Sequence, residues 1–173
     1  MPRRLHGKAA RAAGPAPAVI DPPPRFYRPN VGLMLIAPDR RVFVGRRLNQ
    51  PDAWQMPQGG VDKGETPVEA ACRELAEEVG TSRALLLRES KDWITYDVPE
   101  SLQPPHWKGR WRGQAQKWFA LAFTGTDADI DLAAHEREFD AWQWLPAREL
   151  IDRIVAWKRP VYEAVVKEFA DLL

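Results

Sequence analysis

The pattern of apolar positions predicts a hairpin followed by three separate strands. A continuous apolar run over residues 31–37 predicts a strand buried on both faces, and residues 41–46 alternate around Val42 and Val44 after a turn at Pro38-Asp39. Enrichment in β-branched and aromatic residues predicts further strands at 93–98, 118–124 and 142–145.

Apolar residues at three- and four-residue spacing predict a helix over 67–79. Thr66 and Glu69 match a capping box, Pro67 suits the first helical position, and Gly80 is placed to end the helix in a left-handed conformation. The stripe expected to face a core consists of Val68, Ala71, Cys72, Leu75 and Val79. Cys72 therefore has a packing role.

Two more helices follow, one opened by Pro146 and running to about 151, and a longer one opened by Pro160. Strands interleaved with helices but without regular βαβ alternation predict an α/β fold, with a mixed sheet between helical layers. The domain is expected to span residues 26–173. Residues 1–25 are rich in Arg, Ala, Gly and Pro and are expected to form a flexible basic tail without a site.

Composition mainly excludes certain kinds of site and partner. The 173 residues suit one domain, and 25 Lys plus Arg against 24 Asp plus Glu give no overall preference for nucleic acid or for a membrane. One cysteine excludes an internal disulfide, and three scattered histidines argue against a zinc site. No segment resembles a secretion signal, so a cytoplasmic protein with no membrane partner is expected.

The helix over 67–79 carries an acidic face. At about 100° of turn per residue, Glu74, Glu77 and Glu78 lie on one arc away from the apolar stripe. Arg73 stands four residues before Glu77 and is placed to position that carboxylate. Taken alone, such a cluster is more often an ordinary solvated helix face than a metal site.

The residues before the helix change this interpretation. Gly59, Glu65 and the run Arg73-Glu74-Leu75-Ala76-Glu77-Glu78-Val79-Gly80 have the spacing of the Nudix box, and the chain resembles the Nudix hydrolase superfamily. The matching positions are Gly59, Gly64, Glu65, Arg73, Glu74, Leu75, Glu77, Glu78 and Gly80. Thr81 departs from the pattern, because the family usually has an aliphatic residue there. The resemblance implies the Nudix fold and a hydrolase that acts on phosphoanhydride bonds.

The resemblance also implies a divalent metal, Mg²⁺, for which Mn²⁺ or another divalent ion can substitute. Its ligands would be Glu74, Glu77 and Glu78, a backbone carbonyl at Gly59 or Gly60, and Glu138 as a fourth acidic ligand. Arg73 joins these glutamates in the implied catalytic set. Which glutamate serves as the general base stays open.

Segments outside the box resemble the bacterial RNA 5'-pyrophosphohydrolase branch. They are residues 27–32, 54–60, 113–119, 138–142 and 158–162, and the likeness spans about 26–170. By resemblance, Arg28 and Lys117 face the phosphates. A base-binding pocket would consist of Arg47, Val155, Trp157 and Lys158. Trp157 stands where phenylalanine is common, and Ala53 where a hydroxyl residue sometimes occurs.

The implied substrate is 5'-phosphorylated RNA, converted to a 5'-monophosphate end at the start of mRNA decay by a monomeric enzyme. Diadenosine polyphosphate hydrolases share most of these segments, so a dinucleoside polyphosphate is the alternative substrate. A nucleotide-binding module without activity is a remoter alternative, and the complete set of Arg73, Glu74, Glu77 and Glu78 argues against it.

Residues 104–112 interleave cations with two tryptophans. This composition suits contact with single-stranded RNA, and equally suits a loop that packs its tryptophans onto the sheet.

Overall fold

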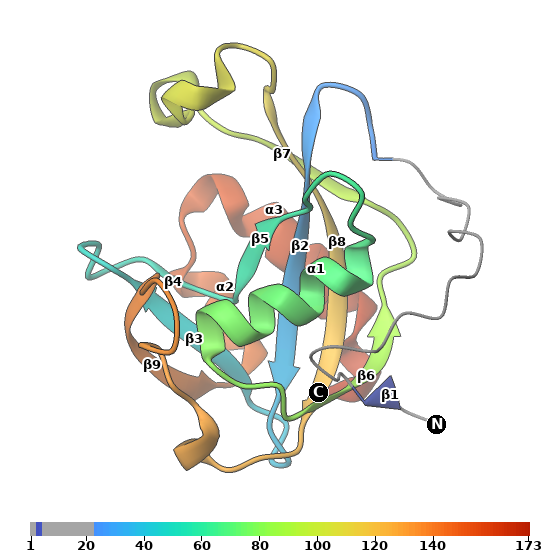
Figure 1. Ribbon diagram of the computed structural model, residues 1–173, viewed down its shortest axis with the longest axis vertical. Helices are drawn as coiled ribbons and strands as arrows, with labels where there is room; N and C mark the ends of the chain where they lie inside the picture. The colour runs from blue at the N-terminus through green and yellow to red at the C-terminus, as the bar shows by residue number, and fades with distance from the viewer. Residues whose placement is uncertain (1–2, 5–22) are drawn as a thin grey trace.

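The long apolar run in the first part of the chain forms the centre of a mixed sheet. In the computed structural model, which describes residues 3–4 and 23–173, β2 (Tyr27–Ile36) pairs in parallel with β8 (Gly113–Phe123), from Tyr27 opposite Gly113 to Ile36 opposite Ala122. The strand order is β1-β6-β8-β2-β3-β4, with β5 beside β2, β7 beside β8 and β9 beside β3 (Figure 1). The other strands are β1 Arg3–Arg4, β3 Val42–Arg47, β4 Trp54–Gln55, β5 Gln58–Gly60, β6 Ala84–Glu89, β7 Ile94–Asp97 and β9 Phe139–Leu145.

Helices cover both faces of this sheet. Figure 1 shows α1 (Pro67–Glu74) in front, and α2 (Ala147–Arg153) and α3 (Arg159–Glu168) behind. Successive β2 residues alternate between two cores, so that Leu33 and Leu35 pack with the α1 residues and Met34 and Ile36 with those of α2 and α3. Burial on both faces explains the continuous apolar run and confirms the predicted α/β architecture.

The predicted acidic helix has the predicted ends. The Thr66 side chain accepts from the Glu69 amide, Glu69 bonds back to Thr66, and Gly80 has a φ of 74°. Its second half, η1 (Leu75–Val79), is a π-helical turn instead of a continued α-helix. The wider turn changes which side chains point inward, and π turns often occur at functional sites.

The predicted apolar stripe of α1 is wrong at one position. Val68 is 37% exposed, whereas Ala71, Leu75 and Val79 are buried as expected, and Ala70 is buried although the pattern did not include it. Cys72 is half-buried and packs against the same core. Val68 lies in the first helical turn and is not among the residues that pack into this core.

The two C-terminal helices occur where proline predicted them. α2 follows Pro146, and α3 has Pro160 in its first turn. Short helical turns connect the elements: η2 Glu100–Leu102, η3 Pro105–Trp107, η4 Asp127–Asp129, η5 Ala156–Lys158 and η6 Ala170–Leu172. Among the described residues, no helix has the length and apolar character needed to span a bilayer.

Strand starts differ from the prediction more than strand ends do. β2, β8 and β9 begin at Tyr27, Gly113 and Phe139 instead of 31, 118 and 142. Polar residues such as Arg28, Asn30, Gln114, Gln116 and Asp140 interrupt these first segments, and a continuous apolar pattern therefore does not mark them. The pattern also missed β4, β5 and β6, since two of these are very short and β6 is leucine-rich, a composition that suits helices as well.

The predicted N-terminal tail falls largely outside the described residues, because residues 1–2 and 5–22 belong to it. Arg3–Arg4 within it forms β1, which pairs antiparallel with β6 at Leu85 and Leu86. The division into a tail, 1–25, and a domain, 26–173, stays a prediction.

Candidate active site

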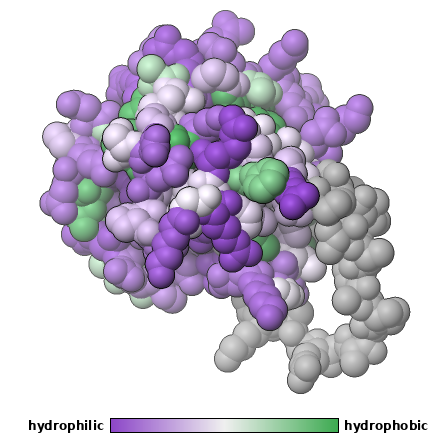
Figure 2. Space-filling view, turned by 90° about the horizontal axis from the view of Figure 1, so that it is seen from above, coloured by the Kyte–Doolittle hydropathy of each residue, from purple (hydrophilic) through white to green (hydrophobic). Residues whose placement is uncertain are grey.

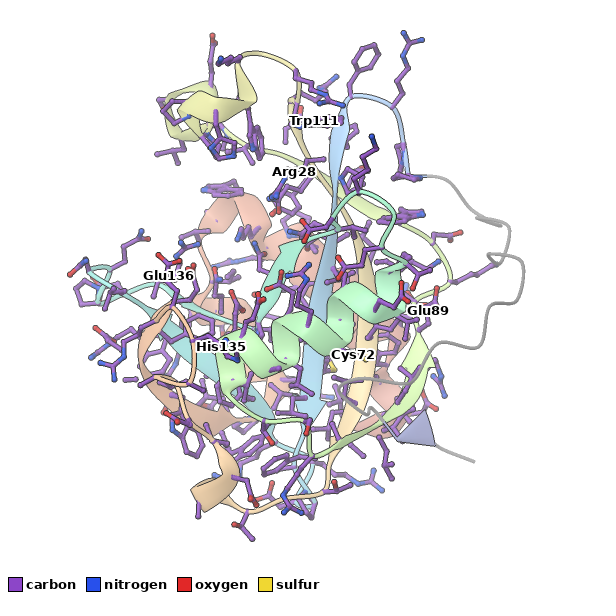
Figure 3. All side chains as sticks on the ribbon, in the orientation of Figure 1. Arg28, Cys72, Glu89, Trp111, His135 and Glu136 are labelled. Atoms are coloured by element: carbon purple, nitrogen blue, oxygen red, sulfur yellow. The ribbon has the colours of Figure 1, made fainter. Side chains whose placement is uncertain are left out.

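The acidic helix and the glycine strand beside it form one wall of a polar cavity. The cavity has a volume of about 480 Å³, and its other walls come from β2, β3, β8 and the loop before β9. Figure 3 shows His135 and Glu136 of that loop beside α1, with Arg28 above them. Of the predicted site residues, the cavity is lined by Arg28, Arg47, Gly59, Gly60, Glu74, Glu77, Glu78 and Glu138.

The three helix glutamates differ in exposure. Glu74 and Glu78 are 7% and 8% exposed, although the sequence placed both on an open helix face, whereas the Glu77 side chain is 43% exposed. The difference arises because β5 packs directly over this part of the helix and covers it. Buried carboxylates need partners, and both have one.

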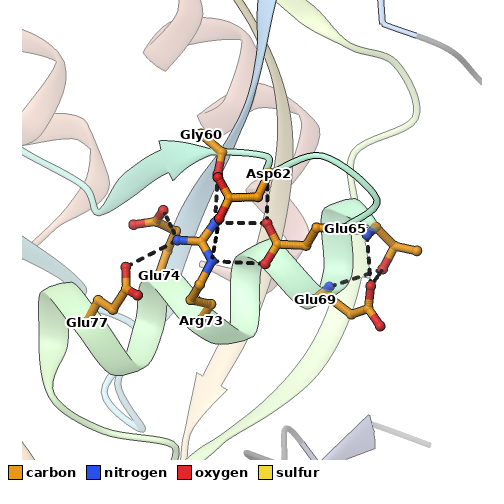
Figure 4. Close-up of polar contacts among 8 residues, drawn as sticks. Gly60, Asp62, Glu65, Glu69, Arg73, Glu74 and Glu77 are labelled. Carbon is orange, nitrogen blue, oxygen red and sulfur yellow. Dashed lines mark hydrogen bonds and ion pairs between the residues drawn. The ribbon is translucent and has the colours of Figure 1, made fainter.

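Arg73 is the partner that organises most of this wall. Its Nε and Nη2 donate to the two oxygens of Glu65 at 2.9 Å each, and its Nη1 donates to Glu74 at 2.6 Å and to Glu77 at 3.1 Å. Nη2 also donates to the Gly60 carbonyl at 2.7 Å, and Figure 4 shows the whole network. All five guanidinium N–H groups are thus used, which fixes the loop and the carboxylates relative to each other.

The glycines allow the loop to approach the helix closely. A Cβ atom on Gly59 would lie 1.8 Å from the Glu74 carboxyl carbon, and one on Gly60 would lie 2.3 Å from Nη2 of Arg28. Any side chain at these two positions would displace a charged group from the cavity. This explains in physical terms why the motif has glycine here.

Burial raises the pKa of both buried carboxylates, and nearby negative charges add to the increase. Desolvation raises the pKa of Glu74, against the hydrogen bond and charge of Arg73. Desolvation also raises the pKa of Glu78 well above its usual value, although the Gln58 amide donates to it at 2.9 Å. The negative charges of Glu74 and Glu138 raise it further. Such a cluster favours a bound cation, which would stabilise the ionised forms.

The donor set fits a divalent cation. Carboxylate oxygens from three or four glutamates and a carbonyl from a glycine loop are the hard ligands that Mg²⁺ prefers. Within residues 3–4 and 23–173, no three His, Cys, Asp or Glu side chains already converge on one metal position. Glu74 and Glu77 instead bond to Arg73, and Glu78 to the Gln58 amide. Binding would therefore exchange these partners for the ion.

A second cavity of about 340 Å³ adjoins the acidic one and has a different character. The two share Arg47, Gln55, Gln58 and Gln114 as a common wall. All four residues predicted for the base pocket line the second cavity: Arg47, Val155, Trp157 and Lys158. Trp157 packs against Tyr96 with ring centroids 5.6 Å apart. We call this second cavity the aromatic cavity.

Lys158 is a buried cation in the wall of the aromatic cavity. It is 6% exposed, and its ammonium lies 5.3 Å from the Trp157 ring and 5.7 Å from the Tyr96 ring. Desolvation, and then the charge of Arg47, lower its pKa to about 8, although the charge of Glu78 acts in the opposite direction. Its nearest acceptor is Gln58 at 3.2 Å. A ligand with acceptor atoms would satisfy this ammonium better than its present neighbours do.

The sequence reasoning missed the amides that connect the two cavities. Gln116 donates to Asn30 at 2.8 Å and to Gln58 at 2.9 Å, and Gln58 also accepts from Lys158. These residues occur within the segments 27–32, 54–60 and 113–119. The available signal was the group of polar residues Gln114, Gln116 and Lys117 at the start of β8, whose later residues are apolar.

Lys117 does not lie with the other predicted phosphate-binding residue. It neighbours Gln116 on β8 and therefore points to the opposite face of the sheet, where its ammonium donates to the Lys91 carbonyl at 3.1 Å. It also forms an ion pair with Glu89 at 3.5 Å, and Figure 3 shows Glu89 on the other side of α1 from His135. The structure thus brings Arg28, but not Lys117, to the acidic cavity.

The tryptophan-rich segment divides into two parts. Trp107 is 3% exposed, belongs to the core behind the sheet and lines the aromatic cavity. Arg110 and Arg112 are exposed, and Trp111 between them is half-buried. Neither the RNA-contact interpretation nor the packed-loop interpretation therefore describes the whole segment 104–112.

Comparison with known proteins agrees with this geometry. The NUDIX domain family matches residues 26–165, which is most of the chain. The chain therefore belongs to the NUDIX family. Within it, the chain falls in the branch of proteins named RNA pyrophosphohydrolase.

The relatives are similar over nearly their whole length. The RNA pyrophosphohydrolase of Rhodospirillum rubrum is 58% identical over 144 residues, which cover 83% of this chain and 87% of that protein. The RNA pyrophosphohydrolase of Rickettsia bellii is 49% identical over 148 residues, which cover 85% and 92%.

Solved structures confirm the predicted Nudix fold. The E. coli dihydroneopterin triphosphate pyrophosphohydrolase superposes with a TM-score of 0.62 and 25% identity, covering 82% of this chain and 98% of that one. A C. elegans Ap4A hydrolase superposes with a TM-score of 0.61 and 18% identity, covering 83% and 98%.

Proposed function

We propose that this protein is an RNA 5'-pyrophosphohydrolase that uses Mg²⁺ to convert 5'-tri- or diphosphorylated RNA ends to 5'-monophosphates. The observation that carries the proposal is the common wall between an acidic cavity and an aromatic, cationic one. A substrate that spans both must combine a polyphosphate with a nucleobase. The relatives named RNA pyrophosphohydrolase point to the same substrate.

The acidic cavity would bind the cation. Glu74, Glu77, Glu78 and Glu138 supply carboxylate oxygens, and Gly59 or Gly60 supplies a backbone carbonyl. When bound, a divalent ion neutralises the polyphosphate and lowers the pKa of an attacking water. Mn²⁺ has similar ligand preferences and would substitute for Mg²⁺.

The chain's own residues position the reacting groups. Arg28 lines the acidic cavity, and its guanidinium is suited to bind a phosphate through two parallel hydrogen bonds. Arg73 orients Glu74 and Glu77 and is a positioning residue. Water adds to phosphorus, the phosphoanhydride P–O bond breaks, and the water proton passes to a carboxylate of the cluster. The RNA keeps one phosphate, and the other phosphates depart as pyrophosphate or, one bond at a time, as orthophosphate.

The aromatic cavity would bind a base of the RNA. Trp157 offers a ring face for stacking, and Lys158 and Arg47 offer donors to base acceptors. Val155 is 39% exposed and contributes an apolar contact. Because Trp157 already packs against Tyr96, it is rigid before the substrate arrives, which reduces the entropy lost on binding.

The alternative substrate is a dinucleoside polyphosphate, which also combines phosphates with bases. The likeness to the C. elegans Ap4A hydrolase is one of fold, at 18% identity, and does not favour this alternative. We propose further that the protein acts as a monomer in the cytoplasm, where removing the terminal phosphates would start mRNA decay.

A paired assay tests the proposal. The protein is incubated with Mg²⁺ and equal concentrations of a 5'-triphosphorylated oligonucleotide and of diadenosine tetraphosphate, and both products are quantified. We expect the RNA to reach the 5'-monophosphate with the higher kcat/KM. Efficient consumption of the dinucleotide alone would contradict the RNA assignment while leaving the hydrolase class intact.

A further inference from the structure

An aromatic and cationic patch that is exposed except for one half-buried tryptophan lies next to the acidic cavity. It is formed by the chain just before β2 and the chain just before β8, and its members are Arg25, Phe26, Arg110, Trp111 and Arg112. We call it the entry patch. Figure 3 shows Trp111 at this end of the molecule, above Arg28.

Backbone and side-chain contacts join the two segments of the entry patch. The Arg112 amide donates to the Phe26 carbonyl at 3.0 Å, and the Arg112 guanidinium lies 5.7 Å from the Tyr27 ring. Both segments run directly into strands that reach the cavity, since Arg28 pairs with Gln114 and both line it. At about 3.3 Å per residue, Phe26 lies only about 7 Å along the chain from Arg28.

Phe26 is unusual in two respects. Its side chain is 56% exposed, and its φ is 68°, in the left-handed region that bulky residues rarely adopt. The conformation costs free energy and directs a large apolar ring into solvent, so core packing does not explain it. Strained residues of this kind occur preferentially where a ligand binds.

Cations accompany the aromatic rings of the entry patch. The Arg25 guanidinium lies 4.9 Å from the Phe26 ring, and that of Arg110 lies 4.5 Å from the Trp111 ring. Arg112 is paired with Asp97 at 2.5 Å, whereas no ion pair of Arg25 or Arg110 is found among the described residues. Figure 2 looks onto this end of the molecule, where small apolar areas lie within a mainly hydrophilic surface.

This combination fits single-stranded nucleic acid. Exposed rings stack on successive bases, and unpaired arginines bind the phosphates between them. The position next to Arg28 also matters, because RNA whose 5' phosphates occupy the acidic cavity must leave it toward some surface. A dinucleoside polyphosphate ends within the two cavities and has no chain to extend.

We propose that the entry patch binds the nucleotides of an RNA substrate that follow those in the two cavities. Phe26 and Trp111 would stack with bases, and Arg25 and Arg110 would contact the backbone. The inference rests on the proposed function, and it makes RNA length a determinant of affinity at this site.

The test compares two RNA lengths. KM is measured for 5'-triphosphorylated RNAs of two and of eight nucleotides that share their first two residues, with Phe26→Ala, Arg110→Glu and the parent. We expect KM for the octamer to rise about 5- to 10-fold in each variant, and KM for the dinucleotide to stay within about twofold. Phe26→Trp should restore the octamer KM, because stacking tolerates either ring.

A matched control and a binding assay keep the outcomes distinct. Leu87→Ala truncates another exposed apolar side chain, 38% exposed on β6, and should change neither KM. Fluorescence anisotropy with a 5'-monophosphorylated octamer measures binding without turnover. The affinity for this octamer should weaken by the same factor in Phe26→Ala and Arg110→Glu. The salt dependence of that binding should also decrease in Arg110→Glu.

The results separate this inference from the proposed function. If the parent hydrolyses both RNAs and the variants match it in KM and anisotropy, the entry patch does not bind RNA and the inference is overturned. If the parent hydrolyses neither RNA but binds the octamer through Phe26 and Arg110, the patch stands and the proposed reaction fails.

Discussion

The acidic and the aromatic cavity meet at a common wall, but they are built in different ways. The acidic wall comes from one stretch of chain, the glycine strand β5 and the helix that follows it, and Arg73 connects its parts. The aromatic cavity takes its residues from β3, β4, β7, the loop before β8 and η5, which are far apart in the sequence. We infer that the chemistry depends on a local motif, whereas substrate selection depends on the tertiary fold.

The two cavities also differ in the charge that they bury. Glu74 and Glu78 are buried on the acidic side, and Lys158 is buried on the aromatic side. Burial of each of these three charged groups is unfavourable without a ligand. Desolvation raises the pKa of the two glutamates and lowers that of Lys158 to about 8. A substrate with acceptors at the base and a cation at the phosphates would relieve both.

Glu78→Gln should have the largest effect on activity, and this effect should arise on the acidic side. We expect kcat to fall about 1,000-fold, equivalent to about 4 kcal/mol, because the amide keeps the shape and loses the charge that a cation needs. The melting temperature should stay the same or rise, since burial disfavours the charged form. Glu136→Gln, which changes another acid of the same cavity, is the control and should retain most activity. Equal activities of the two variants would remove Glu78 from the mechanism.

Arg73→Lys should weaken the acidic side less severely. A lysine has three donors on a flexible stem and cannot reproduce the five hydrogen bonds of the guanidinium. We expect the Mg²⁺ concentration for half-maximal activity to rise about 10- to 100-fold, with partial rescue at high Mg²⁺. Arg83→Lys, at a side chain 63% exposed, is the matched control and should not change it. Lost activity with an unchanged Mg²⁺ requirement would contradict this positioning role.

Lys158→Met should stabilise the protein while impairing the aromatic side. The lysine is charged in the unfolded chain up to about pH 10.5, and its pKa falls to about 8 on folding. The cost to stability is therefore fully present below pH 8 and disappears between pH 8 and 10.5. We expect about 2 kcal/mol of added stability at pH 7, from denaturant unfolding, together with a higher KM for RNA.

The pH dependence gives that prediction a control. The stability difference between Lys158→Met and the parent should shrink as pH rises above 8. Lys167→Met, at an exposed lysine on α3, should show no such difference at any pH. A methionine variant less stable than the parent at pH 7 would mean that Lys158 is already well stabilised in the free protein.

Trp157→Ala should have the smallest effect and should affect only the aromatic side. Loss of one stacking partner should raise KM for RNA about 10-fold, equivalent to about 1.4 kcal/mol, with the Mg²⁺ requirement unchanged. Trp157→Phe should behave like the parent. A changed Mg²⁺ requirement in Trp157→Ala would show that the two sides are not independent.

The contrast between the cavities also explains what could be predicted from the sequence. The capping box, the Gly80 stop and the Arg73–Glu77 pair are local and were predicted correctly. The burial of Glu74 and Glu78 was not, because it depends on how β5 packs over the helix. The base-pocket residues came from family resemblance alone, since periodicity cannot place η5 beside β3.

Lys117 is a second residue whose surroundings could not be predicted from the sequence. Resemblance placed it with Arg28, but a strand alternates its side chains, and Gln116 already points to the cavities. Where a strand lies between two layers, the face that each residue takes depends on register and cannot be deduced from the motif.

The most direct test of the two-cavity account is a crystal structure with Mg²⁺ and a non-hydrolysable 5'-triphosphorylated RNA dinucleotide. The account predicts an ion bound by Glu74 and Glu78, with phosphates beside it and Arg28, and a base stacked on Trp157. A base bound elsewhere, or carboxylates still paired with Arg73 and Gln58 with no ion near them, would contradict it.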